Sequence, residues 1–148
     1  MMAAATTPLT AQYGARSHPL RWGPQVSYDF NGDNVGLGAR LEHSMAGLLG
    51  TERVDGVLEV NWFPATVDVF DLTYNAVYRF ESRGVAPYLG AGLSWWIASG
   101  NGNTGTTLHL DALAGLKFKP MGRVTPLLQM RYVYVDGDAL LLTAGILF

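Results

Sequence analysis

The chain has 148 residues, a length that suits one domain with a substantial core. Hydrophobic residues make up 49% of it and charged residues only 15%, whereas ordinary soluble domains contain about 25% charged residues. The formal net charge is -2 and there is no Lys/Arg run, so we expect no nucleic-acid partner. The absence of cysteine excludes disulfides and thiolate metal sites, and it fits passage through an oxidising compartment.

The first 19 residues predict no part of the fold. Their opening, MMAAATTPLTAQ, has small residues and an Ala before Gln, like the end of a secretory signal peptide around its cleavage site. The basic and apolar regions that such a signal requires are missing. We therefore interpret residues 1–19 either as a signal-peptide remnant or as an N-terminal tail, and residues 20–148 as one domain. No apolar stretch reaches the roughly 20 residues that a membrane helix needs.

From Leu20 onward, apolar and polar side chains alternate in segments that Gly, Pro and Asn separate. This period of two is typical of β-strands, and helical periodicity fits none of the segments as well. In the first segment, LRWGPQVSYDF, Trp22 and Val26 lie on the face opposite Gln25 and Asp29. In chain order, the expected strands are residues 20–30, 35–45, 54–62, 69–80, 86–97, 108–119, 126–134 and 139–148.

Short polar stretches connect the expected strands. NGDN at 31–34 is a strong signal for a tight turn, because Asn and Gly tolerate a positive φ. We expect the longest polar loop at 98–106, ASGNGNTGT. Eight strands of roughly 9–11 residues are each long enough to cross a bilayer when tilted by about 45°. The remaining connections are expected at 46–53, 63–66, 81–84, 120–123 and 136–138.

The two faces of these strands differ in composition. One face carries no Asp, Glu, Lys or Arg, and apart from tyrosines its one titratable residue is His43. Lipid would enforce this exclusion, since a charge facing lipid costs roughly 2–4 kcal/mol at mid-membrane depth, but a soluble core would also exclude charge. The other face mixes glycines with long charged side chains, which suits a narrow enclosed space. These charged residues are Arg40, Glu42, Glu59, Asp71, Arg79, Asp111, Lys117 and Arg131.

We therefore expect an all-β fold, an eight-stranded antiparallel up-and-down transmembrane barrel with a polar, filled lumen. Inside it the eight charged residues would form a structural network in which acids and bases neutralise one another. Aromatic residues toward the strand ends of the apolar face fit the aromatic girdles of membrane barrels. The alternative is a soluble barrel whose apolar face lies at the centre.

Three stretches carry a resemblance to a known family: NAVYRF followed by VAPYLGAGLSW, then DALAGLKFKP, and finally GILF. In this order they make the chain from about residue 20 to 148 resemble small eight-stranded outer-membrane barrels of Gram-negative bacteria, the OmpA/OmpX-like outer membrane beta-barrel domain proteins. In this family a terminal Phe with apolar residues at alternate positions before it resembles the signal read by the outer-membrane assembly machinery. Here those positions are Ala144, Ile146 and Phe148.

The resemblance also implies a location and an orientation. The protein would be an integral protein of the bacterial outer membrane with both termini in the periplasm. Its partners would be outer-membrane lipids, lipopolysaccharide and the assembly machinery, and it would be a monomer. The connections at 46–52, 81–84 and 120–123 would face the periplasm.

His43 and Ser44, in RLEHSMAGL, form the nucleophile-like pair of the chain. The pair resembles the His-x-Ser-Asn element of outer-membrane lipid A deacylases, but its spacing differs and the Asn is missing. Neighbouring residues of a strand point to opposite faces, so a direct hydrogen bond between these side chains is not expected. We prefer to interpret His43 as a structural residue at the membrane interface.

Two further pairs have a chemical and a structural interpretation. His109 and Asp111 share the inner face, but no third metal ligand is evident, so we favour a hydrogen bond in the lumen over a metal site. Glu42 and Glu59 are a carboxylate pair of the kind used in acid–base catalysis, yet the arginines on the same face favour ion pairing. We expect no catalytic residue, metal or cofactor, and we expect inward aromatic residues, Tyr88 and Trp96, to help fill the lumen.

These observations predict a non-enzymatic integral outer-membrane protein without a large pore, which serves envelope structure or surface interaction. A pore is disfavoured because eight strands leave no aqueous channel once long side chains point inward. Two alternatives stay open. The first is an outer-membrane lipid-modifying enzyme of the lipid A deacylase kind, and the second is a soluble lipocalin-like barrel that binds an apolar ligand.

Overall fold

The computed structural model describes residues 19–134 and 138–148, so the expected N-terminal tail lies outside the described residues except for Pro19. Most of the described chain is in strands, and one helical turn, α1 (Ala46–Leu49), lies between the second and third strands. Within the described residues, no helix is long and apolar enough to cross a membrane. The strands are β1 (Arg21–Asp29), β2 (Asn34–Ser44), β3 (Val54–Phe63), β4 (Asp68–Arg79), β5 (Ala86–Gly100), β6 (Asn103–Lys117), β7 (Thr125–Tyr134) and β8 (Ala139–Leu147).

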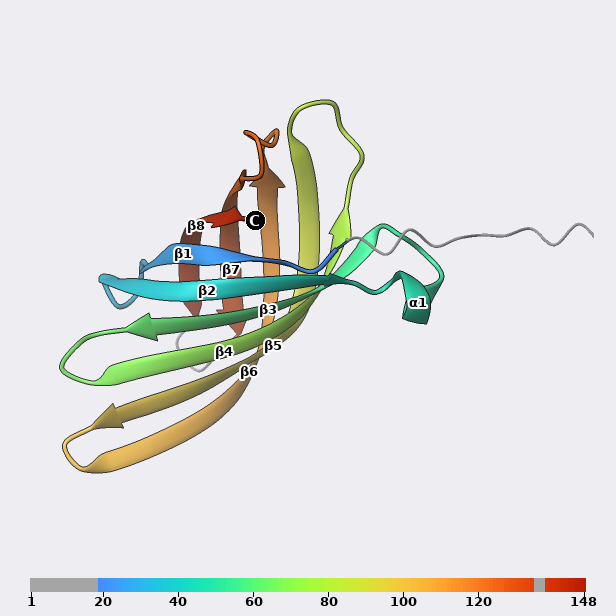
Figure 1. Ribbon diagram of the computed structural model, residues 1–148. Coiled ribbons are helices and arrows are strands. Elements are labelled where there is room, and N and C mark those ends of the chain that lie inside the picture. Colours follow the sequence, from blue (N-terminus) through green and yellow to red (C-terminus); the bar gives the residue numbers. More distant parts are fainter. Residues whose placement is uncertain (1–18, 135–137) are drawn as a thin grey trace, which may run out of the picture.

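The strands form one closed cylinder (Figure 1). Each strand pairs antiparallel with the next one in the chain, and β1 pairs antiparallel with β8. The predicted eight-stranded up-and-down barrel is therefore confirmed. The β1–β2, β3–β4 and β5–β6 turns lie together at what we call the hairpin end, whereas α1 lies at the terminal end, where β1 begins and β8 finishes.

The apolar face of the strands points outward. Trp22 is 58% exposed and Leu110 is 63% exposed, which are high values for large apolar side chains in a folded chain. Along the described strands, the outward positions hold no Lys, Arg or Glu, and one Asp, Asp68, at the first residue of β4. The charged face points to the barrel axis. The alternative of a barrel with its apolar face at the centre is therefore wrong.

The strands have the length that a membrane requires. A strand of 10 residues such as β3 is about 33 Å long at about 3.3 Å per residue. At a tilt of about 45° it spans about 23 Å, close to the apolar band of about 25 Å found on membrane barrels. The outward apolar surface is thus as tall as a hydrocarbon layer.

The longest hairpin corrects one prediction. Residues 98–106 were expected to form a polar loop, but β5 continues to Gly100 and β6 starts at Asn103, so that both strands have 15 residues. The connection is a two-residue turn in which Asn101 has φ 51° and Gly102 has φ 78°, as tight hairpins require. Polar side chains do not prevent this, because a hairpin is held by backbone hydrogen bonds and beyond the bilayer both faces can meet water.

One edge of this hairpin has no partner strand. β6 pairs with β5 along its full length, from Asn103 to Lys117, but its pairing with β7 starts only at Leu110. The segment 103–109 therefore has backbone N–H and C=O groups on its outer edge that no described strand pairs. Its threonines and glycine are exposed.

The closing contact between β1 and β8 is the shortest ladder of the barrel. It runs from Gln25 with Gly145 to Asp29 with Leu141, whereas β1 pairs with β2 along all of its nine residues. Pro24 has no backbone N–H to donate, and the ladder with β8 begins at the residue after it. Beyond this interruption, the Phe148 N–H donates a hydrogen bond of 2.8 Å to the Trp22 carbonyl.

Candidate functional site

The lumen contains a hydrogen-bonded network of charged side chains, and Glu42 is its centre near the terminal end. Arg40 Nε donates to Glu42 Oε1 at 2.8 Å. Lys117 Nζ and Arg21 Nη2 both donate to Glu42 Oε2, at 2.7 and 2.9 Å. One carboxylate therefore holds cations from β1, β2 and β6, and it ties together strands that are not neighbours in the sheet.

A second group surrounds Glu59 at the middle of the lumen. Arg40 Nη1 donates to Glu59 Oε1 at 2.7 Å and to Gln129 Oε1 at 2.6 Å. The Gln129 amide donates to both Glu59 oxygens, at 3.1 and 3.2 Å, and the Tyr88 hydroxyl donates to Gln129 Oε1 at 3.1 Å. The Arg40 guanidinium also lies 5.5 Å from the centre of the Tyr88 ring. These contacts cross the full width of the lumen.

Arg131 anchors the network closer to the hairpin end. Its guanidinium donates to Asp71 and Thr73, and it lies 3.6 Å from Glu59 Oε2. The Thr73 hydroxyl donates to Asp71 Oδ1 at 2.7 Å, and the Ser94 hydroxyl donates to Asp111. These groups are buried, and a buried charge is tolerated only when it is paired and hydrogen-bonded. Their mutual contacts therefore stabilise the charges inside the barrel.

Neutral polar side chains continue the network toward β1 and β8. The Gln25 amide donates to Asn61 Oδ1 at 2.8 Å, and Asn61 in turn donates to Asp71 Oδ2 at 3.4 Å. The hydroxyls of Ser27 and Thr143 lie 2.7 Å apart across the β1–β8 contact. The polar contacts therefore reach all sides of the barrel.

Glycines on the inner face provide the space that the large side chains occupy. A Cβ at Gly115 would lie 2.3 Å from Cζ of the Tyr88 ring, and one at Gly36 would lie 2.6 Å from the Phe63 ring. Each large residue thus fills a vacancy opposite it, as the mixture of glycine and long side chains indicates. Apolar side chains such as Phe63 and Leu141 add a buried cluster toward the hairpin end of the lumen.

The structure brings the sequence-predicted network residues together with one exception. Seven of the eight are 5% exposed or less, namely Arg40, Glu42, Glu59, Asp71, Asp111, Lys117 and Arg131. Arg79 instead lies at the terminal opening of the lumen, where its side chain is 22% exposed and its Nε lies 2.6 Å from Asp55 Oδ2. Trp96 is partly buried beside the apolar cluster, whereas Tyr88 is fully buried inside the network.

Sequence reasoning missed two charged members of this network, Arg21 and Asp55. Both stand on the inner face by simple alternation, since Arg21 is two residues before Gly23 and Asp55 is four residues before Glu59. Each lies at the first or second position of its strand, where the alternating pattern begins. With them, the network contains five basic and five acidic side chains. The formal charges of the network therefore cancel.

The side chains of His43 and Ser44 have separate hydrogen-bond partners. His43 points outward, where its Nε2 lies 3.0 Å from the Tyr74 hydroxyl and its ring stacks with the Tyr74 ring at 6.0 Å. The Ser44 hydroxyl accepts a hydrogen bond of 3.2 Å from the Ala46 N–H at the start of α1. In these positions the imidazole does not activate the hydroxyl, because the two side chains share no hydrogen bond.

His109 and Asp111 do not contact each other either. His109 Nε2 lies 2.9 Å from the Thr107 hydroxyl, and its ring packs edge-on against Trp96 at 5.2 Å. Asp111 is engaged by Ser94 deeper in the lumen. In the part of the chain that the structure describes, no group of three or more His, Cys, Asp or Glu residues is arranged to hold a metal ion.

The residues of the expected C-terminal signal lie on the outer surface. Ala144 and Phe148 are exposed and Ile146 is partly exposed, all on the lipid-facing side of β8 and its end. The Phe148 ring contacts the Trp22 ring with centroids 5.5 Å apart. Recognition of these residues by an assembly machinery stays a prediction.

Solved structures of outer-membrane barrels share this fold. The N-terminal β-barrel domain of Pseudomonas aeruginosa OprF is 17% identical to this chain, with a TM-score of 0.70 over 87% of this chain and 95% of that one. Neisserial surface protein A is 18% identical, with a TM-score of 0.68 over 86% and 94% of the two chains. The outer membrane enzyme PagL is 11% identical, with a TM-score of 0.61 over 86% and 98%. At these identities the likeness is one of fold. No protein-family profile and no curated protein matches the sequence.

Proposed function

We propose that this protein is a non-enzymatic, integral outer-membrane barrel that conducts nothing appreciable and serves envelope structure or surface interaction. One observation carries the proposal: large apolar side chains are exposed all around the barrel, while the ion pairs of the Arg40 and Arg131 network are enclosed within it. Water would penalise that arrangement and lipid favours it. The outer-membrane location is supported by the fold shared with the OprF domain and the Neisserial surface protein.

A closed lumen follows from the same network. Eight strands leave an interior just wide enough for side chains, and here Arg40, Glu59, Gln129 and Tyr88 meet across it. A water-filled path would have to separate these partners. We therefore propose that the protein spans the membrane with a closed lumen and does not act as a channel.

Refolding into lipid vesicles tests this proposal. We expect a folded form whose gel mobility changes on heating, and we expect brominated lipids to quench the outward tryptophans Trp22, Trp62 and Trp95. Trp96, which faces inward, provides the internal comparison. A protein that stays monomeric and folded in buffer without detergent would contradict the proposal.

The free edge of β6 favours surface interaction as the more specific role. Segment 103–109 presents unpaired backbone groups at the hairpin end, and an extended peptide can add to such an edge as a further strand. The test is a selection of extended peptides on the refolded protein. Binders that weaken when Thr106→Pro removes one edge N–H group support this role, and a selection without binders counts against it.

Lipid modification is the second candidate, because one protein of the same fold, PagL, is an outer membrane enzyme. In this chain, the residues that support lipid modification are His43 and its neighbours. The His43 imidazole shares no hydrogen bond with the Ser44 hydroxyl and so does not activate it. Incubation of purified protein with lipid A and with phospholipids should leave the mobility of both unchanged. Lipid turnover that His43→Ala abolishes would overturn the non-enzymatic proposal.

A further inference from the structure

Positive charge gathers at the terminal end of the barrel. Nine of the ten Lys and Arg residues of the chain are described, and of these only Arg40 and Arg131 lie in the depth of the lumen. The described residues of the hairpin end carry Asp29, Asp33, Asp68 and Asp138 and no Lys or Arg. The seven basic residues of the terminal end are Arg21, Arg53, Arg79, Arg83, Lys117, Lys119 and Arg123.

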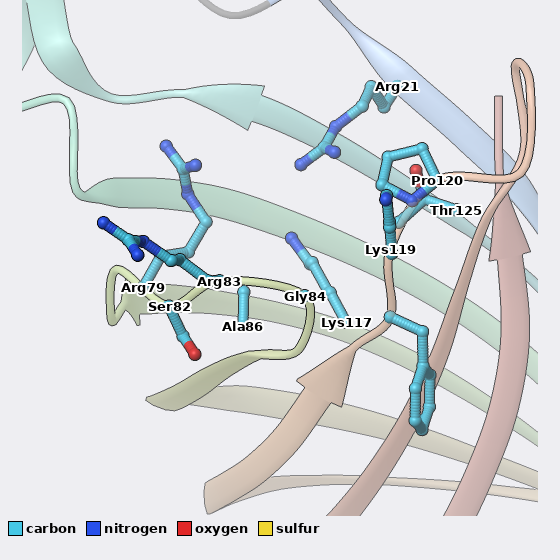
Figure 2. Close-up of a pocket in the computed structure, with 11 residues that line it drawn as sticks. Arg21, Arg79, Ser82, Arg83, Gly84, Ala86, Lys117, Lys119, Pro120 and Thr125 are labelled. Carbon is cyan, nitrogen blue, oxygen red and sulfur yellow. The ribbon is translucent and has the colours of Figure 1, made fainter.

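Five of these seven residues line one cavity, which we call the basic mouth: Arg21, Arg79, Arg83, Lys117 and Lys119. Figure 2 shows these side chains around the opening of the lumen, between the β4–β5 and β6–β7 connections. The cavity has a volume of about 510 Å³, and hydroxyl groups of Ser82 and Thr125 also line it. It is large enough for a phosphate group with part of the molecule that bears it.

Glu42, the carboxylate at the floor of the basic mouth, already has several cationic partners. Arg21 and Lys117 share one oxygen of Glu42, and Arg40 occupies the other oxygen from below. Glu42 thus has three cations for a single negative charge. An incoming anion would compete with Glu42 for Arg21 and Lys117, and with Asp55 for Arg79.

The outer part of the mouth has cations without any partner. Among the described residues, Arg83 and Lys119 form no ion pair, and both are exposed in the connections that flank the cavity. The basic mouth therefore has an uncompensated positive charge that faces its opening.

We infer that the basic mouth is a binding site for an anionic phosphate group. Guanidinium groups bind phosphate oxygens in a fork, an ammonium group adds a point charge, and hydroxyls supply further donors. Phe118, which lines the cavity, and Phe80 beside it are exposed at this end, as aromatic residues are at the membrane–water boundary. The opening therefore lies at the level of lipid headgroups. The phosphate comes either from an anionic phospholipid of the adjoining leaflet or from a soluble molecule.

Two probes separate these sources. In the lipid arm, the full chain is placed in nanodiscs with equal amounts of phosphatidylglycerol and phosphatidylcholine, and the lipids retained after detergent extraction are measured. In the soluble arm, the protein folded in zwitterionic detergent is titrated with inorganic pyrophosphate. We expect selective retention of phosphatidylglycerol, binding of pyrophosphate, or both, and the arm that responds identifies the source.

A pair of double variants tests the site itself. R83Q/K119Q removes the two unpaired cations, which lie outside the strands, and should weaken binding roughly tenfold or more, since each charge-assisted hydrogen bond contributes on this scale. R53Q/R123Q removes the same charge from the same end but outside the cavity, and it should bind like the wild type. Equal weakening in both variants, or no binding of either probe by the wild type, would overturn the inference.

The inference rests on the proposed membrane insertion only for the lipid source. Heat-modifiable gel mobility reports folding and insertion of each variant independently of binding. A protein that inserts but binds neither probe disproves the phosphate site alone. A protein that binds pyrophosphate in detergent but does not insert into vesicles supports the phosphate site and contradicts the proposed function.

Discussion

Arg131 allows a direct test of whether the lumen is dry. Its side chain is 2% exposed, and its guanidinium donates to Asp71 and Thr73 and lies 3.6 Å from Glu59. Arg131→Met keeps much of the side-chain length but removes all three contacts. Asp71 would then keep only the Thr73 hydroxyl at 2.7 Å and the Asn61 amide at 3.4 Å as hydrogen-bond donors.

The size of the loss depends on the surroundings of the pair. Removal of one partner from a buried ion pair costs about 3–5 kcal/mol, whereas an ion pair in contact with water contributes about 0–1 kcal/mol. We therefore expect Arg131→Met to lower the free energy of unfolding by about 3–5 kcal/mol, measured by urea unfolding of the protein folded in vesicles.

A second substitution provides the control for this measurement. Asp71→Asn removes the charge that Arg131→Met leaves without its cation, so the double variant should be more stable than the sum of the two single losses implies. Strict additivity, or a loss below about 1 kcal/mol for Arg131→Met alone, would refute the dry lumen. In that case water would have to enter the barrel.

Three further predictions concern the lipid face, the packing and the pore. Ala112→Arg, in the middle of the lipid-facing side of β6, should cost about 2–4 kcal/mol in the same unfolding assay, and Leu108→Arg nearer the hairpin end about 0–1 kcal/mol; equal costs would contradict the assigned depth. Gly115→Ala should cost about 1–3 kcal/mol because its methyl group meets the Tyr88 ring, and Tyr88→Leu in the same chain should relieve most of this loss. In planar bilayers the wild-type protein should show no steady conductance steps, and regular steps would disprove the closed lumen.

Most of the fold could be predicted from alternation alone. A strand in a small membrane barrel meets lipid on one side and a crowded lumen on the other, so the two chemistries repeat every second residue. The pattern fails where lipid ends, at residues 98–106. There the outward positions become Ser99, Thr104 and Thr106, and a composition typical of loops conceals a hairpin that backbone hydrogen bonds hold together.

The lumen was predictable as a set of residues but not as a set of partners. Alternation assigns Glu42 and Glu59 to the same interior, yet strand stagger decides which cation each one meets. Arg40 reaches Gln129 across the barrel, a pairing with no local signal because it depends on how all eight strands close. Gly115 shows the same limit. From the sequence, a glycine on the inner face indicates unfilled space, but in the structure the Tyr88 ring fills the space beside it.

The short contact between β1 and β8 makes this the place where the barrel opens most easily. Separating these strands breaks the ladder from Gln25 to Asp29 and the backbone hydrogen bonds of Phe148 to Trp22 and of Phe30 to Leu140. This ladder has fewer paired residues than any other in the barrel. Heat or mechanical load should therefore separate β1 from β8 before any other pair of neighbouring strands. Since β1 is made early in synthesis and β8 last, the wall can close there only after the whole described barrel has left the ribosome.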